Sequence, residues 1–168
     1  MSEIVWDRVV RAFHWLTATL FVLSYFVLDG GELWHRVAGY TLGGLLFVRI
    51  VWGFVGSPTA RFASFWPTPK RLFGYLRKFP HGKSSTPGHN PLGGLMVLWM
   101  MLLLSLLVLT GWMQGLDRYW GEEWLMDIHE LVATIMLWSV AVHVIAVVVM
   151  QKLTGKGLIR AMITGRRE

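Results

Sequence analysis

The stretch IHELVATIMLWSVAVHVIAVVVM, residues 128–150, decides the fold of this chain. It is apolar over a length close to the roughly 20 residues that a helix needs to cross about 30 Å of hydrocarbon. It also contains His129 and His143. An imidazole inside a bilayer must find a partner, because water is not there to solvate it. The stretch predicts a membrane-spanning helix whose two histidines need an explanation.

Three further apolar runs of similar length lie at about 10–28, 37–55 and 92–113. The chain has 168 residues, is 54% hydrophobic and contains ten tryptophans, and a soluble domain of this size could not bury so much apolar surface. The runs are too long for the strands of a membrane barrel. The sequence therefore predicts one all-α domain over residues 1–168, an integral membrane bundle of four transmembrane helices.

The first run follows two arginines, as the apolar part of a signal peptide follows its basic segment. It is long, however, and it ends in LDGGEL without a small-residue cleavage site. We expect it to be an uncleaved span.

The positive charges are unevenly distributed between the two ends of the predicted bundle. Thirteen of the sixteen Lys and Arg lie in the N-terminal segment, the connection after the second run and the C-terminal tail, whereas the other two connections hold only Arg36 and Arg118. Seven acids gather at that second end: Asp29, Glu32, Asp117, Glu122, Glu123, Asp127 and Glu130. The positive-inside bias predicts that both termini and the middle connection are cytoplasmic. The basic charge then serves topology and lipid headgroups, and no nucleic-acid-binding motif accompanies it.

The middle connection contains TPKRLFGYLRKF, residues 68–79, which predicts a short helix over about 69–79 with Thr68 as N-cap and Pro69 at the first position. Its apolar side chains share one face, opposite a basic side: Leu72, Tyr75, Leu76 and Phe79 against Lys70, Arg71, Arg77 and Lys78. This pattern is typical of an interfacial amphipathic helix on an anionic leaflet. The alternative is a loop packed against protein.

Four histidines fall at two depths of the predicted bundle. His129 and His143 are fourteen residues apart, about 21 Å along a helix and just short of four turns, so their rings point from nearly the same face. His14 lies near the cytoplasmic end of the first run, at the depth of His143. His35 lies near the outer end of the second run, at the depth of His129. The spacing predicts two histidine pairs, one above the other.

Paired imidazoles at one depth favour one kind of site. A lone membrane histidine is commonly hydrogen-bonded to a neighbouring helix, but four that pair by depth, with two of them in phase on one helix, favour a ligand role. A mononuclear zinc site takes three or four ligands, and a proton relay needs buried carboxylates, which the runs almost lack. Two imidazoles from opposite helices suit the axial positions of a haem iron. Because the chain has no cysteine, thiolate sites, iron–sulfur clusters and c-type attachment are excluded, and the sequence predicts two b-type haems held non-covalently.

Haem propionates are anionic and need cationic or hydrogen-bonding partners. Arg36 adjoins His35, Arg49 lies fourteen residues beyond His35 on the same face, and Arg11 lies just below His14. These arginines are candidate contacts for a propionate or a quinone, although an arginine at a membrane edge is often a snorkelling anchor. Glycines in or beside the second and third runs would let a flat macrocycle or another helix approach closely: Gly39, Gly43, Gly44, Gly93, Gly94 and Gly111.

Several stretches together resemble the bacterial cytochrome b561 family, four-helix membrane cytochromes with two b haems that are related to the cytochrome b subunits of nickel–iron hydrogenases. These stretches are VWDRVVRAFHW (5–15), HRVAGYTLGGLLFVRIVWGFVG (35–56), ARFASFWPTPKRLFGYL (60–76), GHNPLGGLMVLWMMLLLSLLVLTG (88–111), DIHE (127–130) and AVHVIAV (141–147). The resemblance covers nearly the whole chain and implies a multi-pass protein of the bacterial inner membrane.

The resemblance also implies roles for particular histidines. His14 and His143 would bind the cytoplasmic-side haem, and His35 and His129 the periplasmic-side haem, which is the pairing that depth alone predicts. His89, in GHNPLGG, matches a position where a histidine is typical of the family. It would bond a propionate or a quinone there, or simply begin a helix.

An iron with two axial imidazoles has no open position for oxygen or substrate, so it moves single electrons. We expect transmembrane electron transfer between the quinone pool (ubiquinone or menaquinone) and a redox partner. The related families suggest a periplasmic cytochrome c or a respiratory dehydrogenase as that partner.

Two other functions stay open. One is a quinone-linked oxidoreductase that takes electrons from a small donor such as superoxide, and the acidic outer connections disfavour an anionic donor. The other is a membrane anchor subunit of a respiratory complex. Whether the protein is an enzyme in its own right is not decided by its sequence.

Overall fold

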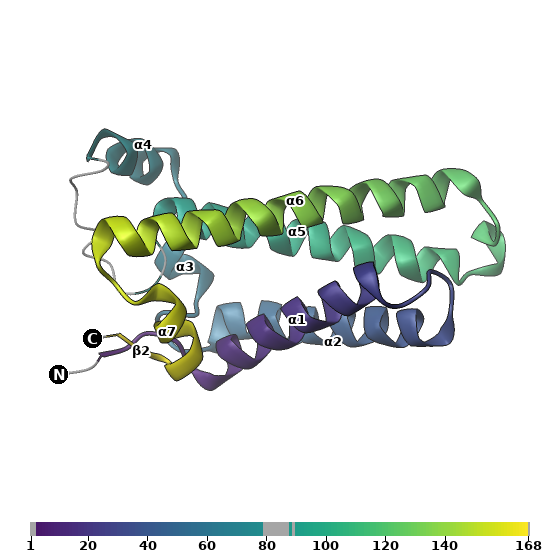
Figure 1. The fold of residues 1–168 in the computed structure, drawn as a ribbon, viewed down its shortest axis with the longest axis horizontal. Coiled ribbons are helices and arrows are strands. Elements are labelled where there is room, and N and C mark those ends of the chain that lie inside the picture. The colour runs from purple at the N-terminus through teal and green to yellow at the C-terminus, as the bar shows by residue number, and fades with distance from the viewer. Residues whose placement is uncertain (1–2, 79–87, 89, 168) are drawn as a thin grey trace.

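The computed structural model describes residues 3–78, 88 and 90–167. In this part of the chain four long helices lie side by side as a bundle (Figure 1): α1 (Arg8–Phe26), α2 (Leu33–Val55), α5 (Pro91–Gln114) and α6 (Glu123–Thr154). Each is long and apolar enough to cross a membrane. The chain is a nearly all-helical, multi-pass membrane protein, and the predicted bundle of four transmembrane helices is confirmed, whereas the cytoplasmic location of both termini stays a prediction.

Shorter elements occupy the ends of the bundle. Helices α3 (Phe62–Phe65), α4 (Pro69–Lys78) and α7 (Leu158–Thr164) lie at the same end as both termini (Figure 1). Strands β1 (Glu3–Ile4) and β2 (Arg166–Arg167) also lie there. The 3-10 turn η1 (Asp117–Tyr119) connects α5 to α6 at the opposite end.

Local sequence explains where the long helices begin and end. The Asp7 carboxylate accepts a hydrogen bond of 2.8 Å from the Val10 amide and caps α1, and Asn90 caps α5 in the same way. Gly155 ends α6 in the left-handed conformation, with φ of 66°. Helix α6 extends beyond the apolar run at 128–150 in both directions, because hydropathy marks the hydrocarbon-facing part of a helix and not its polar ends.

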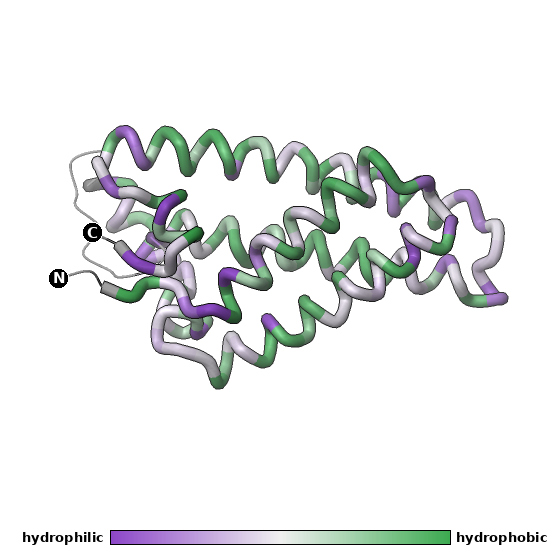
Figure 2. Tube along the Cα trace, turned by 60° about the horizontal axis from the view of Figure 1, so that its bottom comes forward, coloured by the Kyte–Doolittle hydropathy of each residue, from purple (hydrophilic) through white to green (hydrophobic). Residues whose placement is uncertain are grey.

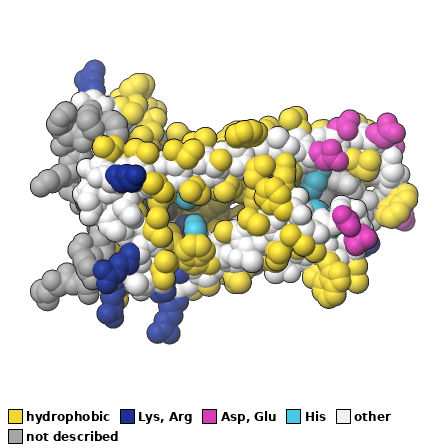
Figure 3. Space-filling model, in the orientation of Figure 1, with side chains coloured by type: hydrophobic (Ala, Val, Ile, Leu, Met, Phe, Trp, Pro, Cys, Tyr) yellow, Lys and Arg dark blue, Asp and Glu magenta, His cyan; other side chains and the backbone are white. Residues whose placement is uncertain are grey.

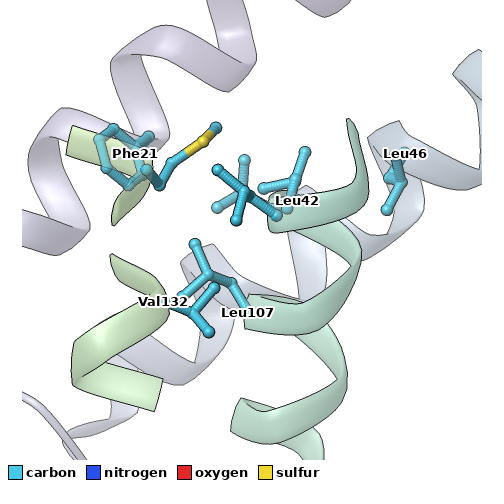
Figure 4. Close-up of a cluster of buried hydrophobic side chains, with 8 residues drawn as sticks. Phe21, Leu42, Leu46, Leu107 and Val132 are labelled. Atoms are coloured by element: carbon cyan, nitrogen blue, oxygen red, sulfur yellow. The ribbon is translucent and has the colours of Figure 1, made fainter. Parts of the chain in front are cut away.

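The core of the bundle lies midway along it. Phe21 of α1, Leu42 of α2, Leu107 of α5 and Val132 of α6 point toward one another in Figure 4. The complete buried cluster comprises Phe21, Leu42, Leu46, Leu103, Leu104, Leu107, Val132 and Met136. Outside this core many large apolar side chains are exposed, and Figure 2 shows hydrophobic residues along the helices with hydrophilic ones mainly at the ends. Such an exterior suits lipid.

The helices do not pack evenly around this core. Helix α5 packs against both α6 and α2, and α2 packs against α1. In the described part of the chain, α6 makes its main contacts with α5 and few with α1 or α2. The spaces between α6 and the α1–α2 pair are therefore the wider ones.

The two ends of the chain are joined. Strands β1 and β2 pair antiparallel, with Ile4 opposite Arg166, and this terminal strand pair continues in hydrogen bonds from the amides of Val5 and Trp6 to the carbonyl of Gly165. The side chains around it form a second buried cluster: Val5, Trp6, Val10, Ala60 and Ala161. The strand pair and α7 were not expected from the sequence.

Helix α4 is the short helix predicted between the second and third spans. Its start agrees with the prediction, since the Thr68 hydroxyl accepts a hydrogen bond of 3.3 Å from the Arg71 amide. The Tyr75 hydroxyl accepts a bond of 3.2 Å from the side-chain amide of Asn90, which ties α4 to the start of α5. Phe79, expected on its apolar face, lies outside the described residues. That α4 lies on the lipid surface stays a prediction.

Candidate functional site

The structure brings the four predicted histidines together in two pairs. The ring centres of His14 on α1 and His143 on α6 are 6.4 Å apart, with the ring planes at 54°. Those of His35 on α2 and His129 on α6 are 6.2 Å apart, with the planes at 64°. Both pairs bridge the wider spaces of the bundle, and Figure 3 shows histidine side chains between the helices at two places along its length.

The spacing of the rings fits a metal held between them. A metal bound to an imidazole nitrogen at about 2 Å lies about 3.1–3.2 Å from the ring centre, so two such ligands on opposite sides of one metal place their centres about 6.3 Å apart. The measured 6.4 and 6.2 Å match this value at both levels. Among the described residues no group of three or more His, Cys, Asp or Glu side chains could hold a metal ion, so a three-ligand zinc site has no support there.

Open space adjoins the pair formed by His35 and His129. A cavity between the helices is lined by His35 and His129, and every long helix contributes to its wall: Phe21, Ser24 and Tyr25 from α1, Gly39 and Leu42 from α2, Leu104, Leu107 and Val108 from α5, and Ala133 from α6. A Cβ added to Gly39 would meet no atom of the described residues within 4 Å, so the α2 backbone is open toward this cavity. The wall is mainly apolar, as a macrocycle with few polar atoms requires.

The histidines differ in the hydrogen bonding of their Nδ1 atoms. The Nδ1 atoms of His14 and His35 are buried and have no hydrogen-bond partner among the described residues. By contrast, Nδ1 of His129 lies 2.8 Å from the hydroxyl of Thr110 on α5. The next residue, Gly111, leaves room for the ring, since a Cβ there would lie 3.3 Å from Cε1 of His129. No feature of the sequence predicts the Thr110 contact, because threonine is common on apolar spans.

Arg49 is a candidate propionate contact whose charged side chain is buried. Its side chain is only 3% exposed, and it donates a hydrogen bond of 3.2 Å to the carbonyl of Ala60. Its guanidinium carbon lies 5.2 Å from the ring centre of Phe62, and its Nη1 group is buried without a partner among the described residues. A buried guanidinium with an unused nitrogen is costly unless an anion satisfies it, which fits a propionate.

The other candidate contacts are placed differently. Arg11 donates a hydrogen bond to the backbone carbonyl of Ile163 in α7, which occupies one of its terminal nitrogens. Arg36 is exposed at the N-terminal end of α2. His89 lies outside the described residues.

The sequence is similar to a defined family over almost its whole length. The family model described as prokaryotic cytochrome b561 matches residues 5–165. A probable Ni/Fe-hydrogenase B-type cytochrome subunit of Rhizobium leguminosarum bv. viciae is 26% identical, and the alignment covers 99% of this chain and 89% of that protein. The protein of the same description from Bradyrhizobium diazoefficiens is 25% identical, with 98% and 85% covered. A probable Ni/Fe-hydrogenase 1 B-type cytochrome subunit of Escherichia coli K12 is 28% identical, and the alignment covers 66% of this chain and 59% of that protein. No solved structure matches the chain at a significant level.

Three findings now coincide: four apolar helices that can span a membrane, histidine pairs spaced for a shared metal, and the family match from residue 5 to residue 165. Members of this family are haem-binding electron carriers of membranes, and the b-type cytochromes among the relatives agree with that description. The chain therefore belongs to the prokaryotic cytochrome b561 family of membrane electron-transfer proteins.

Proposed function

We propose that the protein carries electrons across the bacterial inner membrane through two b-type haems, each held by one histidine pair. His14 and His143 supply the axial ligands of the inner haem, and His35 and His129 those of the outer haem. The observation that carries this proposal is the spacing of the two ring pairs, 6.4 and 6.2 Å. A haem with two axial imidazoles supplies one-electron redox chemistry and leaves no position for a substrate.

The helices hold the two sites in a fixed relation. Met136 is seven residues from both His129 and His143, so the buried core lies about 10 Å from each ligand along α6. Phe21 is likewise seven residues from His14, and Leu42 seven from His35. This apolar core excludes water from the region between the sites and keeps the two histidine levels apart.

Arg49 binds a propionate of the inner haem in this proposal. It lies fourteen residues from His35 on α2, as His143 does from His129 on α6, and it therefore reaches the inner level. Its buried Nη1 group is the donor that lacks a partner among the described residues. Arg11 and Arg36 are further contacts for a propionate or a quinone at the inner and outer levels, and His89 stays a prediction for the same role.

The charge distribution supports an orientation with both termini in the cytoplasm. Figure 3 shows Lys and Arg side chains toward the end where the termini lie and Asp and Glu side chains at the opposite end. The positive-inside bias assigns the basic end to the cytoplasm and the acidic end to the periplasm.

The electron partners follow from this placement. A membrane quinone, ubiquinone or menaquinone, exchanges electrons within the bilayer, and a redox protein meets the acidic end. The relatives are described as subunits of Ni/Fe-hydrogenases, which favours a respiratory dehydrogenase, and the exposed acids also suit a lysine-rich cytochrome c. A superoxide:quinone oxidoreductase is less favoured, because the same acids repel a small anion, and a redox-inactive anchor is excluded if haem is bound.

Haem content tests the proposal directly. A pyridine hemochrome assay on the purified protein is expected to give two b haems per chain, extractable by acid acetone because no thioether bond holds them. One haem per chain would overturn the assignment of one histidine pair, and no haem would overturn the assignment of both.

A further inference from the structure

The hydroxyl of Thr110 lies between a backbone carbonyl and the imidazole of His129. Its oxygen is 2.7 Å from the carbonyl oxygen of Leu106, one turn earlier on α5, and 2.8 Å from Nδ1 of His129 on α6. The side chain is only 7% exposed, so water does not compete for these contacts. The arrangement is a short chain of hydrogen bonds that crosses from α5 to α6.

The donors and acceptors of this chain favour one arrangement of the protons. The carbonyl oxygens of Leu106 and Leu107, 2.7 and 3.3 Å from the Thr110 hydroxyl, can only accept, and together they favour donation of the single hydroxyl proton to the backbone. The hydroxyl oxygen then offers a lone pair to His129, and the imidazole donates from Nδ1–H. In the neutral ring the other nitrogen, Nε2, carries the lone pair, and this is the atom that a metal takes.

We propose that Thr110 is a positioning residue for the outer haem: it holds His129 in the tautomer and ring orientation that ligate iron, and it makes this imidazole a stronger electron donor. The inference rests on the proposed function, in which His35 and His129 bind that haem. A histidine ligand that donates its second N–H becomes more basic. A more basic ligand stabilises ferric over ferrous iron, so Thr110 lowers the reduction potential of the outer haem.

The effect is confined to one of the two sites. The Nδ1 atoms of His14 and His35 lack such a partner within the described residues, so neither receives this support from the protein. Thr110 therefore acts on the outer haem through His129 and leaves the inner haem unchanged.

Valine and serine replacements of Thr110 separate the hydroxyl from its methyl group. Thr110→Val keeps the shape and removes the acceptor, and Thr110→Ser keeps the acceptor. Thr41→Val is the matched control, because the Thr41 hydroxyl also bonds a carbonyl one turn earlier, that of Val37 at 2.8 Å, but lies on an exposed face of α2. Redox titration of the purified holoprotein measures the midpoint potentials of both haems. The histidine-to-alanine ligand variants show beforehand which potential belongs to which haem.

In the Thr110→Val variant we expect the midpoint potential of the outer haem to shift upward and that of the inner haem to stay unchanged. In Thr110→Ser and Thr41→Val we expect both midpoint potentials to equal those of the unaltered protein. Nitrogen-15 NMR of the haem-free protein is expected to show the Nδ1–H tautomer of His129, and a tautomer mixture in Thr110→Val. Loss of the outer haem in Thr110→Val alone would support the same role. Unchanged potentials in Thr110→Val, with both haems bound, would overturn the inference and leave the proposed function intact. Absence of haem from the His35–His129 pair in the unaltered protein would instead overturn the proposed function.

Discussion

The carboxylate of Asp7 and the indole of Trp52 connect the start of α1 to the end of α2 through a hydrogen bond of 2.9 Å. The same carboxylate accepts a bond of 2.5 Å from the Ser57 hydroxyl, and it caps α1 through the Val10 amide. Burial raises the pKa of the Asp7 carboxyl, but these hydrogen bonds outweigh burial, and its pKa lies below the usual value. One side chain thus fixes the position of His14's helix against the helix of His35.

Replacing Asp7 with Asn is expected to lower the stability of the detergent-solubilised protein in a pH-dependent way. The depressed pKa means that Asp7 stabilises the fold above pH 3.8, its ordinary pKa, and that this contribution disappears as pH falls through the folded value. At pH 7 the loss should be about 1–2 kcal/mol, for a helix cap with charged hydrogen bonds. Thermal unfolding of both proteins should show melting temperatures that differ at pH 7 and converge below pH 4. A difference that is independent of pH would show that the charge of Asp7 has no role.

The two haem sites are expected to be separable by mutation. His14→Ala or His143→Ala should remove the inner haem and largely spare the outer one, because each pair has its own two ligands. His35→Ala or His129→Ala should do the reverse. Visible and EPR spectra of the four variants check this, with Thr41→Val as the control for a span substitution away from the ligands. Loss of the same haem from His14→Ala and His35→Ala would contradict the pairing.

Reporter fusions are expected to place both termini in the cytoplasm. The predicted cytoplasmic segments contain thirteen Lys and Arg, whereas the other two connections contain two, and the positive-inside bias predicts this orientation from that difference. The terminal strand pair also requires the N- and C-terminal ends to share one side. Reporters after Glu168 or within residues 70–83 should report cytoplasm, and one near Gly121 should report periplasm. A C-terminal reporter active in the periplasm would reverse the inner and outer assignments.

Neutralising outer acids is expected to slow the reaction with a cationic cytochrome c. Glu122 and Glu123 are exposed at the start of α6, before His129, and Glu122 accepts a hydrogen bond of 3.0 Å from the Trp124 indole. The double variant Glu122→Gln with Glu123→Gln keeps an acceptor for Trp124 and removes two charges. Association should slow several-fold at low salt, and the rate for the unaltered protein should fall as ionic strength rises.

Stopped-flow rates against salt concentration check this, and an unchanged haem spectrum serves as the control because neither residue is a ligand. A small anionic donor should react faster with the same variant, so the two donors separate the competing functions. A salt-independent rate with the cytochrome would rule out docking at this surface.

The features that depend on a single helix could be predicted from the sequence. The four spans follow from apolar length, and the two histidine levels follow from the fourteen-residue spacing of His129 and His143, because helical rise and turn angle convert sequence distance directly into depth and direction. Those quantities need no knowledge of the neighbouring helices. The proximity of the rings at each level was predicted on this basis, whereas their role as ligands stays a prediction.

Features that depend on two elements at once could not be predicted. Helix α5 is apolar on all sides, so no hydrophobic face indicates which side meets α6, and the contact of Thr110 with His129 has no periodic signal. The terminal strand pair joins two-residue strands through backbone groups, which leave no alternation in the side chains. The burial of Arg49 depends on α3, whose Phe62 ring lies over the guanidinium.

Helix α6 is the last of the long helices in chain order, and it contributes His129 to one pair and His143 to the other. A nascent chain that has inserted only α1, α2 and α5 therefore contains one ligand of each pair and cannot complete either. With both pairs as haem ligands, cofactor loading must follow the synthesis and insertion of α6, and it cannot proceed helix by helix. On the proposed ligand assignment the two sites would mature together, within one late step of biogenesis, and a chain truncated before residue 129 would lose both haems at once.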